Sequence, residues 1–217
     1  RVTGENVSGD QYFRQVWDNS AFTRLKPDTT STAGRKMVGI ANREPYRTPK
    51  VMRRFYVGAI NSAKDSIKLL NPYLTLTHSV KKAIKRALKR GVKFEVMLAE
   101  KSDIPLTPDC AFYNLHWMMK KGAEVWIFQG GFHHTKVIMV DGKFCTVGST
   151  NLDARSLRWD YEENAIIIDK PTTHELSTLF DRDKQRSFRL NRDNWKTWKS
   201  RGQRFKCWFA HLFATWL

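Results

Sequence analysis

Two apolar spacings alternate along one stretch of the chain, and this alternation constrains the fold more than any other feature of the sequence. Between residues 52 and 128, short runs with strand spacing alternate with longer runs with helix spacing. We predict helices at residues 52–63, 78–90 and 108–121, and strands at residues 66–70, 92–98 and 123–128. Because strand-helix-strand crossovers place successive strands side by side, this part of the chain predicts parallel strands covered by helices.

The pattern changes after residue 128. Two apolar runs, at residues 134–140 and 143–148, are separated by Asp141-Gly142, a pair typical of a two-residue β-hairpin turn. We predict a further strand at residues 161–169 and a long helix at residues 172–188. The expected fold class is therefore mixed α/β, a largely parallel central sheet with helices on both faces.

Composition divides the chain into three parts. Residues 1–50 are expected to be an inter-lobe linker or edge segment, with a short helical pattern at residues 12–17 and a polar stretch from residue 27 to residue 49. Residues 51–190 form the α/β lobe, and residues 191–217 form a basic, aromatic tail. This tail suits an interfacial helix on an anionic membrane, and it equally suits a terminal helix packed on the domain or on a partner subunit.

The charge of the chain indicates a polyanionic partner. Lys and Arg total 38 against 21 Asp and Glu, which gives a net charge of +17. Such a surface favours nucleic acid, an anionic membrane or a phosphorylated substrate, and charge alone does not choose among them. The three cysteines lie far apart without paired spacing, so we expect a reducing compartment and neither a disulfide framework nor a zinc site.

The predicted hairpin can bring four chemically useful side chains together. His134 and Lys136 are two residues apart on one predicted strand, so both should point to the same face. Ser149 and Asn151 are likewise two apart at the end of the return strand. An imidazole can attack phosphorus or protonate a leaving oxygen, while an ammonium, a hydroxyl and an amide stabilise charge on the other phosphate oxygens. The hairpin therefore predicts phosphodiester chemistry.

The spacing of these residues also carries a family resemblance. They read His134-x-Lys136-x4-Asp141-x6-Gly148-Ser149-x-Asn151. The string resembles the HKD signature of the phospholipase D superfamily at every position. The resemblance implies that the His, Lys, Ser and Asn are catalytic, that Asp141 and Gly148 are structural, and that no metal or cofactor is needed. Glu162 falls where the family places an acidic residue that orients the catalytic histidine.

Other polar residues near the motif have weaker claims. Tyr73 and Asp103, at predicted strand ends beside the expected site, are candidates for substrate contact. The side chain of His133 should point away from that of His134, so we interpret it as a packing residue. The remaining histidines lack companions, and we expect them at the surface or in packing: His78, His116, His174 and His211. The basic run at residues 81–90 is a solvated helix face or a site for lipid headgroups or nucleic acid.

Within the superfamily, the chain resembles the C-terminal lobe of bacterial cardiolipin synthases, which carry two HKD motifs in one polypeptide. The segments that carry this resemblance are residues 148–156 and 157–162, Asn71-Pro72-Tyr73, the loop at residues 101–103, and residues 1–4 leading to Phe13 and Trp17. It implies transfer of a phosphatidyl group between phosphatidylglycerol molecules through a phosphohistidine, with this chain supplying one of two half-sites. In such relatives the N-terminal histidine is generally the nucleophile, which makes His134 the acid–base residue.

The resemblance also implies partners and a location. We expect a second HKD lobe, either upstream in the same polypeptide or from a homodimer mate, and a fragment that is inactive as a monomer. We expect the cytoplasmic side of the bacterial inner membrane, reached peripherally or through upstream segments. The alternative is a homodimeric single-motif phosphodiesterase or nuclease, for which the positive charge would bind the phosphate backbone of nucleic acid. A non-catalytic basic module is a third class, which the intact motif disfavours.

Overall fold

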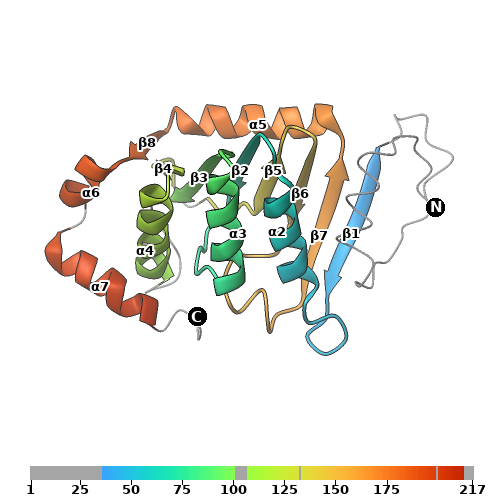
Figure 1. Ribbon diagram of the computed structural model, residues 1–217, viewed down its shortest axis with the longest axis horizontal. Coiled ribbons are helices and arrows are strands. Elements are labelled where there is room, and N and C mark those ends of the chain that lie inside the picture. Colours follow the sequence, from blue (N-terminus) through green and yellow to red (C-terminus); the bar gives the residue numbers. More distant parts are fainter. Residues whose placement is uncertain (1–35, 101–106, 132, 199, 213–217) are drawn as a thin grey trace.

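A computed structural model describes residues 36–100, 107–131, 133–198 and 200–212 (Figure 1). The helical pattern predicted at residues 12–17 and the candidate residue Asp103 lie outside these ranges. The strands are β1 Met37–Arg43, β2 Ser66–Leu70, β3 Lys93–Ala99, β4 Glu124–Phe128, β5 Val137–Val140, β6 Phe144–Gly148, β7 Glu162–Ile168 and β8 Ser187–Leu190. The helices are α2 Val51–Ser62, α3 His78–Lys89, α4 Thr107–Lys120, α5 Lys170–Lys184, α6 Arg192–Trp198 and α7 Arg201–Leu212.

The strands form one mixed sheet in the order β1-β7-β6-β5-β2-β3-β4-β8. The β2–β3 and β3–β4 pairs are parallel, as the crossover pattern predicts. The remaining pairs are antiparallel, because β5, β6 and β7 follow one another as a meander while β1 and β8 close the two edges. The predicted α/β class with helices on both faces is confirmed, and parallel pairing is confined to the three strands of the crossovers.

The two faces of the sheet bury separate sets of apolar side chains. On β2, Ile67 and Leu69 join the core under α2, α3 and α4, while Leu70 joins a second cluster with Phe180 of α5. Between them Lys68 also faces α5, where its Nζ lies 2.7 Å from a side-chain oxygen of Asp181. This alternation is the period of two that a strand buried on both faces requires. Figure 1 shows α5 alone on its side of the sheet.

Both edge strands differ from the sequence prediction. Part of the segment expected as a linker or edge, Met37–Arg43, pairs with β7 along its whole length. The helix predicted at residues 172–188 ends at Lys184, and Ser187–Leu190 then pairs with β4. In β8 the alternation of Phe188 and Leu190, which pack into the core, is too short to separate a strand from a continuing helix by periodicity.

The tail packs against α4 through one side of its two helices. Trp195 of α6 is buried, and its ring lies 4.5 Å from the ring of His116 on α4. Cys207 of α7 is also buried, with its Sγ 3.6 Å from an oxygen of Asp109 on α4. One side of the tail therefore packs on the domain, as the second of the two sequence-based alternatives expected. Over the described residues, none of the helices combines the length and apolar character needed to cross a bilayer.

Candidate active site

Residues of the HKD string gather at the end of the sheet where β2 finishes. Register brings this about, because Val137 at the start of β5 lies opposite both Leu70, the last residue of β2, and Val147 near the end of β6. Gly148, which ends β6, lies opposite Asn164 of β7. The residues that precede β5, follow β6 and begin β7 therefore meet there: His134, Lys136, Ser149, Asn151 and Glu162.

Ser149 is held against the start of β7 by several hydrogen bonds. Its hydroxyl donates to a carboxylate oxygen of Glu162. The backbone N–H of Glu163 donates to the same hydroxyl at 3.0 Å, and the Ser149 N–H donates to the Glu163 carbonyl at 3.0 Å. Ser149 is exposed while Glu162 is buried. The buried carboxylate therefore fixes the position of a hydroxyl that solvent can reach.

Gly148 allows this close approach. A Cβ at this position would collide with the carbonyl oxygen of Glu163 and with atoms of Asn164. Any larger residue would therefore push the end of β6 away from β7 and separate Ser149 from Glu162.

His134 and Lys136 precede the strand that we predicted to contain them. β5 begins at Val137, because β2 offers no residue to pair with beyond Leu70. The same-face argument therefore does not apply to this pair: His134 is exposed, whereas Lys136 is buried. The Lys136 ammonium donates to the His134 carbonyl at 2.8 Å, which fixes the backbone that carries the imidazole.

Tyr73 lies beside the imidazole. Its ring stands edge-to-face to that of His134 with centroids 6.0 Å apart, and it is buried. Its backbone N–H donates to the Asn71 side-chain oxygen at 3.2 Å. The structure thus brings Tyr73 to the predicted site, where it forms one wall beside His134.

A buried polar network positions the segment that carries Asn151. The Thr150 hydroxyl donates to the Asn164 side-chain oxygen at 2.6 Å, and the Asn71 amide donates to the Thr150 carbonyl at 3.3 Å. The Asn164 amide in turn donates to the Tyr56 hydroxyl at 3.3 Å. Asn151 itself is half-buried, and its Oδ1 has no hydrogen-bond partner among the described residues.

Asp141 lies at the far end of the hairpin and organises the turn. Asp141 and Gly142 both have positive φ, 53° and 60°, as a type I′ turn requires. The Asp141 carboxylate accepts backbone N–H groups at 3.0 Å from Lys64 and at 2.9 Å from both Asp65 and Ser66. This geometry anchors the hairpin to the start of β2 and keeps the aspartate remote from the other motif residues.

Sequence reasoning missed Arg43, which is fully buried behind the site. It ends β1 directly opposite Glu162, and its Nη1 donates to the Asp160 carbonyl. Its Nε and Nη2 have no hydrogen-bond partner within the described part of the chain. Burial lowers the pKa of Arg43, and the negative charges of Asp160 and Glu162 oppose that effect. The only signal in the sequence was a basic residue closing a short apolar run.

Two further acids complete the surroundings. Burial raises the pKa of Asp153 to about 6, and the charge of Glu162 adds to the effect, while the Ser156 N–H donates to Asp153 at 2.6 Å. His133 lies on the α5 side, where its Nε2 is 3.1 Å from an oxygen of Asp183. In the described residues, no three His, Cys, Asp or Glu side chains lie close enough to share a metal ion.

These contacts place an imidazole, an ammonium, a hydroxyl and an amide at one rim of the sheet. Two of them are held by hydrogen bonds, the Ser149 hydroxyl to the buried Glu162 and the Lys136 ammonium to the His134 carbonyl. An arrangement of this kind can attack or protonate at a phosphate while stabilising the charge on its oxygens.

Comparison with known proteins adds sequence relatives. A family described as cardiolipin synthase, PLD-like domain, matches residues 56–184, a range that includes the whole HKD string. A cardiolipin synthase of Oceanobacillus iheyensis is 32% identical over 185 residues, covering 85% of this chain and 38% of the relative. One of Listeria welshimeri is 32% identical over 197 residues, covering 88% and 41%. The chain thus spans about two fifths of the length of these relatives.

Solved structures share the fold. A phosphatidylserine synthase of Haemophilus influenzae superposes with a TM-score of 0.68 at 12% identity, over 97% of this chain and 54% of the other. A phospholipase D family member, Nuc of Salmonella typhimurium, superposes with a TM-score of 0.62 at 19% identity, over 72% of this chain and 99% of the other. The same lobe is therefore found both within a longer chain and as nearly an entire chain.

Proposed function

The chain belongs to the cardiolipin synthase PLD-like domain family, and on that premise we propose that it supplies one of two half-sites of a phosphatidyltransferase. The substrate is phosphatidylglycerol, two molecules of which give cardiolipin and glycerol. The reaction takes place at the cytoplasmic face of a bacterial inner membrane. What supports this proposal most is the meeting of His134, Lys136 and Ser149 at one rim, in residues spaced as the family spaces them.

The proposed cycle is a double displacement. The imidazole of the second half-site attacks phosphorus, and the P–O bond to the glycerol headgroup breaks. His134 gives its proton to the departing glycerol oxygen. A hydroxyl of the second phosphatidylglycerol then returns a proton to His134 and attacks the phosphohistidine, the P–N bond breaks, and cardiolipin is released. Atoms and charge balance with no metal or cofactor in the scheme.

The other residues stabilise the phosphate through both steps. Lys136 and Ser149 donate hydrogen bonds to non-bridging oxygens of the phosphate. The side-chain amide of Asn151, at the end of the HKD string, donates to the same oxygens. Glu162 holds the Ser149 hydroxyl in place through the hydrogen bond that joins them. Tyr73, packed edge-to-face on His134, restricts the orientations open to the imidazole.

The test is cardiolipin formation from phosphatidylglycerol by this chain co-expressed with an N-terminal HKD lobe. We expect His134→Ala to abolish turnover. We expect His133→Ala, which alters a neighbouring histidine paired with Asp183 on the α5 side, to leave it largely intact. Equal loss in both variants would contradict the assignment of His134, and hydrolysis of DNA without any action on phosphatidylglycerol would contradict the transferase.

A homodimeric phosphodiesterase or nuclease is the second candidate. Two observations favour it: the structure of Nuc is matched over 99% of its own length by this lobe, and the chain carries a net charge of +17. Two copies of the lobe would then supply the two imidazoles. Nuclease activity in a dimer of this chain alone would select this candidate.

A further inference from the structure

Helix α7 turns three large aromatic side chains toward solvent. Phe205, Trp208 and Phe209 are 64%, 45% and 50% exposed. Their spacing of three and four residues places them on one side of the helix, and the rings of Phe205 and Trp208 lie 5.5 Å apart. We call these three residues the aromatic stripe. Large apolar residues grouped in this way on a surface indicate an interaction site.

The aromatic stripe is not what holds α7 on the lobe. The inner side of the helix does that through Cys207, which is buried against Asp109, and through Lys206, whose Nζ lies 3.0 Å from the same carboxylate. Arg204 adds a hydrogen bond at 3.1 Å to the Lys196 carbonyl of α6. The helix is therefore docked through contacts outside the aromatic stripe, whose three side chains are exposed to solvent.

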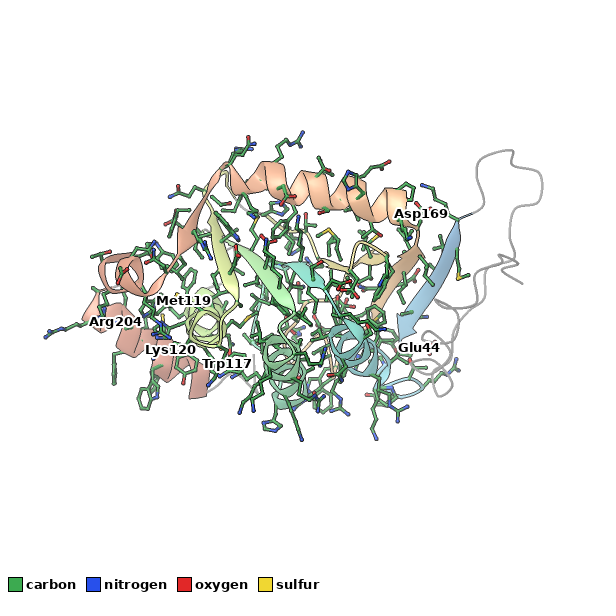
Figure 2. All side chains as sticks on the ribbon, turned by 45° about the horizontal axis from the view of Figure 1, so that its top comes forward. Glu44, Trp117, Met119, Lys120, Asp169 and Arg204 are labelled. Carbon is green, nitrogen blue, oxygen red and sulfur yellow. The ribbon has the colours of Figure 1, made fainter. Side chains whose placement is uncertain are left out.

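The surroundings of the stripe are basic. Arg201 is exposed on α7 itself. On the same face of the sheet, α3 has a row of exposed basic residues and no acidic residue: Lys82, Lys85, Arg86 and Lys89. α4 lies between these two helices, as Figure 1 shows, and Figure 2 shows its Trp117, Met119 and Lys120 near Arg204 of α7. The Lys81 ammonium 6.0 Å above the Trp117 ring joins α3 to α4.

We propose that the aromatic stripe of α7, with the basic row of α3, docks the lobe on an anionic lipid bilayer. Aromatic rings insert at the level of the headgroups, and lysine and arginine side chains are attracted to anionic lipid. Charge complementarity favours this occupant over a protein of mixed charge. The inference deepens the proposed function, because it names the surface through which the half-site reaches its lipid.

The location of α7 fits this role. Asp109, which α7 contacts, lies in the first turn of α4. α4 follows β3 as a crossover helix, so its first turn is near the carboxyl ends of β2 and β3, where the candidate site opens. The part of α7 that contacts Asp109 therefore lies toward the end of the sheet where the candidate site opens. A bilayer bound to α7 would present its headgroups beside His134.

Vesicle binding tests the proposal without requiring turnover. The full chain is sedimented with vesicles of phosphatidylglycerol and phosphatidylcholine, and with vesicles of phosphatidylcholine alone. We expect binding only to the anionic vesicles, and we expect the triple variant Phe205→Ser, Trp208→Ser, Phe209→Ser to bind them at least roughly tenfold more weakly. The variant Lys82→Glu, Lys85→Glu, Lys89→Glu should lose a similar factor and most of the salt dependence.

Matched controls come from exposed apolar residues elsewhere. Leu179→Ser on α5, across the sheet, and Tyr46→Ser remove side chains that are 44% and 93% exposed. Both should bind anionic vesicles as the unaltered chain does. Circular dichroism checks that each variant is folded, and the part of the tryptophan quenching by brominated lipid that disappears in Trp208→Phe reports insertion of Trp208.

Two results would overturn the proposal. One is unchanged vesicle binding in the folded triple variant. The other combines two observations: Trp208 of the unaltered chain is not quenched by brominated lipid, and the triple variant no longer associates with a second lobe in light scattering. Together they would make the aromatic stripe a protein interface. Failure of the proposed function looks different: vesicle binding would persist while no variant, nor the unaltered chain with its second lobe, converted phosphatidylglycerol.

Discussion

Arg43 stands behind the candidate site as a charge without access to solvent. A buried guanidinium is unfavourable unless acids and carbonyls surround it, and here Glu162 faces it across the β1–β7 pair while Asp160 accepts from it through its carbonyl. Glu162 in turn accepts the Ser149 hydroxyl. The charge of Glu162 acts on Arg43 across the β1–β7 pair, and Glu162 contacts a residue at the rim, so we infer that Arg43 is a positioning residue for the site.

We expect Arg43→Met to lower kcat of the two-lobe assembly by roughly 10- to 100-fold with little change in KM, because Glu162 would lose the charge that fixes it and Ser149 would shift. The variant should also be less stable, by about 3 kcal/mol, since the buried Glu162 carboxylate loses a nearby positive charge. Steady-state kinetics and thermal unfolding measure the two effects.

Two comparisons separate positioning from general damage. Arg43→Lys keeps the charge and should recover part of kcat. Arg47→Met removes a side chain that is exposed and only loosely paired with Glu44, at 3.6 Å, and should change neither quantity. A loss of stability in Arg43→Met with normal kcat per folded molecule would leave Arg43 as a structural residue alone.

Among single residues, the sequence could identify the string but not its contacts. The hairpin turn at Asp141-Gly142 fixes which residues meet, so the clustering of Ser149 with the segment before β5 follows from local chemistry. The contact of Glu162 with Ser149 depends on β6 and β7 lying side by side, and the position of Arg43 opposite Glu162 depends on β1 pairing with β7. The β1–β7 pairing joins residues more than a hundred positions apart, which no local pattern encodes.

At the scale of elements, periodicity predicted the crossover unit and failed at the edges. α2, α3 and α4 each end one residue before the predicted end, because long amphipathic stripes define helices well. β1 and β8 were missed, since an edge strand needs only one neighbour and has a short or irregular apolar pattern. The tail was predicted as helical, but the sequence left open whether it lies on a membrane or packs on protein. Its packing on α4 depends on contacts between particular side chains, which the spacing of apolar residues does not identify.

One contact in that packing should respond to pH. Burial, together with the charges of Lys120 and Arg204, lowers the pKa of His116 to about 4 from an ordinary value of 6.5. The folded state therefore favours the neutral imidazole against Trp195, and the unfolded state binds the proton first. The resulting stability is fully present above pH 6.5 and is lost as the pH falls toward 4, with a maximum effect on the order of 2 kcal/mol.

We expect His116→Phe to flatten this dependence. Thermal unfolding of the unaltered chain should lose more stability between pH 7 and pH 5 than that of the Phe variant, and tryptophan fluorescence should report the accompanying loosening of α6. His174→Phe, at an exposed histidine of α5, is the control and should follow the unaltered chain. Identical pH profiles for His116→Phe and the unaltered chain would show that the imidazole does not couple to the docking of the tail.

The whole molecule is a lobe with one HKD string, and it spans about two fifths of the cardiolipin synthases that it resembles in sequence. The proposed chemistry needs two imidazoles in opposite protonation states, one to attack phosphorus and one to protonate the leaving oxygen. His134 is exposed at the end of the sheet, so a second lobe can approach it. In the proposed mechanism, association with a second lobe therefore controls activity.

As a strict monomer the chain should show essentially no turnover of phosphatidylglycerol, because one histidine cannot be nucleophile and acid in the same step. Activity should rise with the concentration of an added N-terminal HKD lobe and saturate when light scattering reports a one-to-one complex. Adding an N-terminal lobe whose own histidine is replaced by alanine should give the complex without the turnover. Robust turnover by a species that light scattering shows to be monomeric would contradict the two-imidazole mechanism, whereas turnover by a self-associated pair would place two copies of His134 across one phosphate.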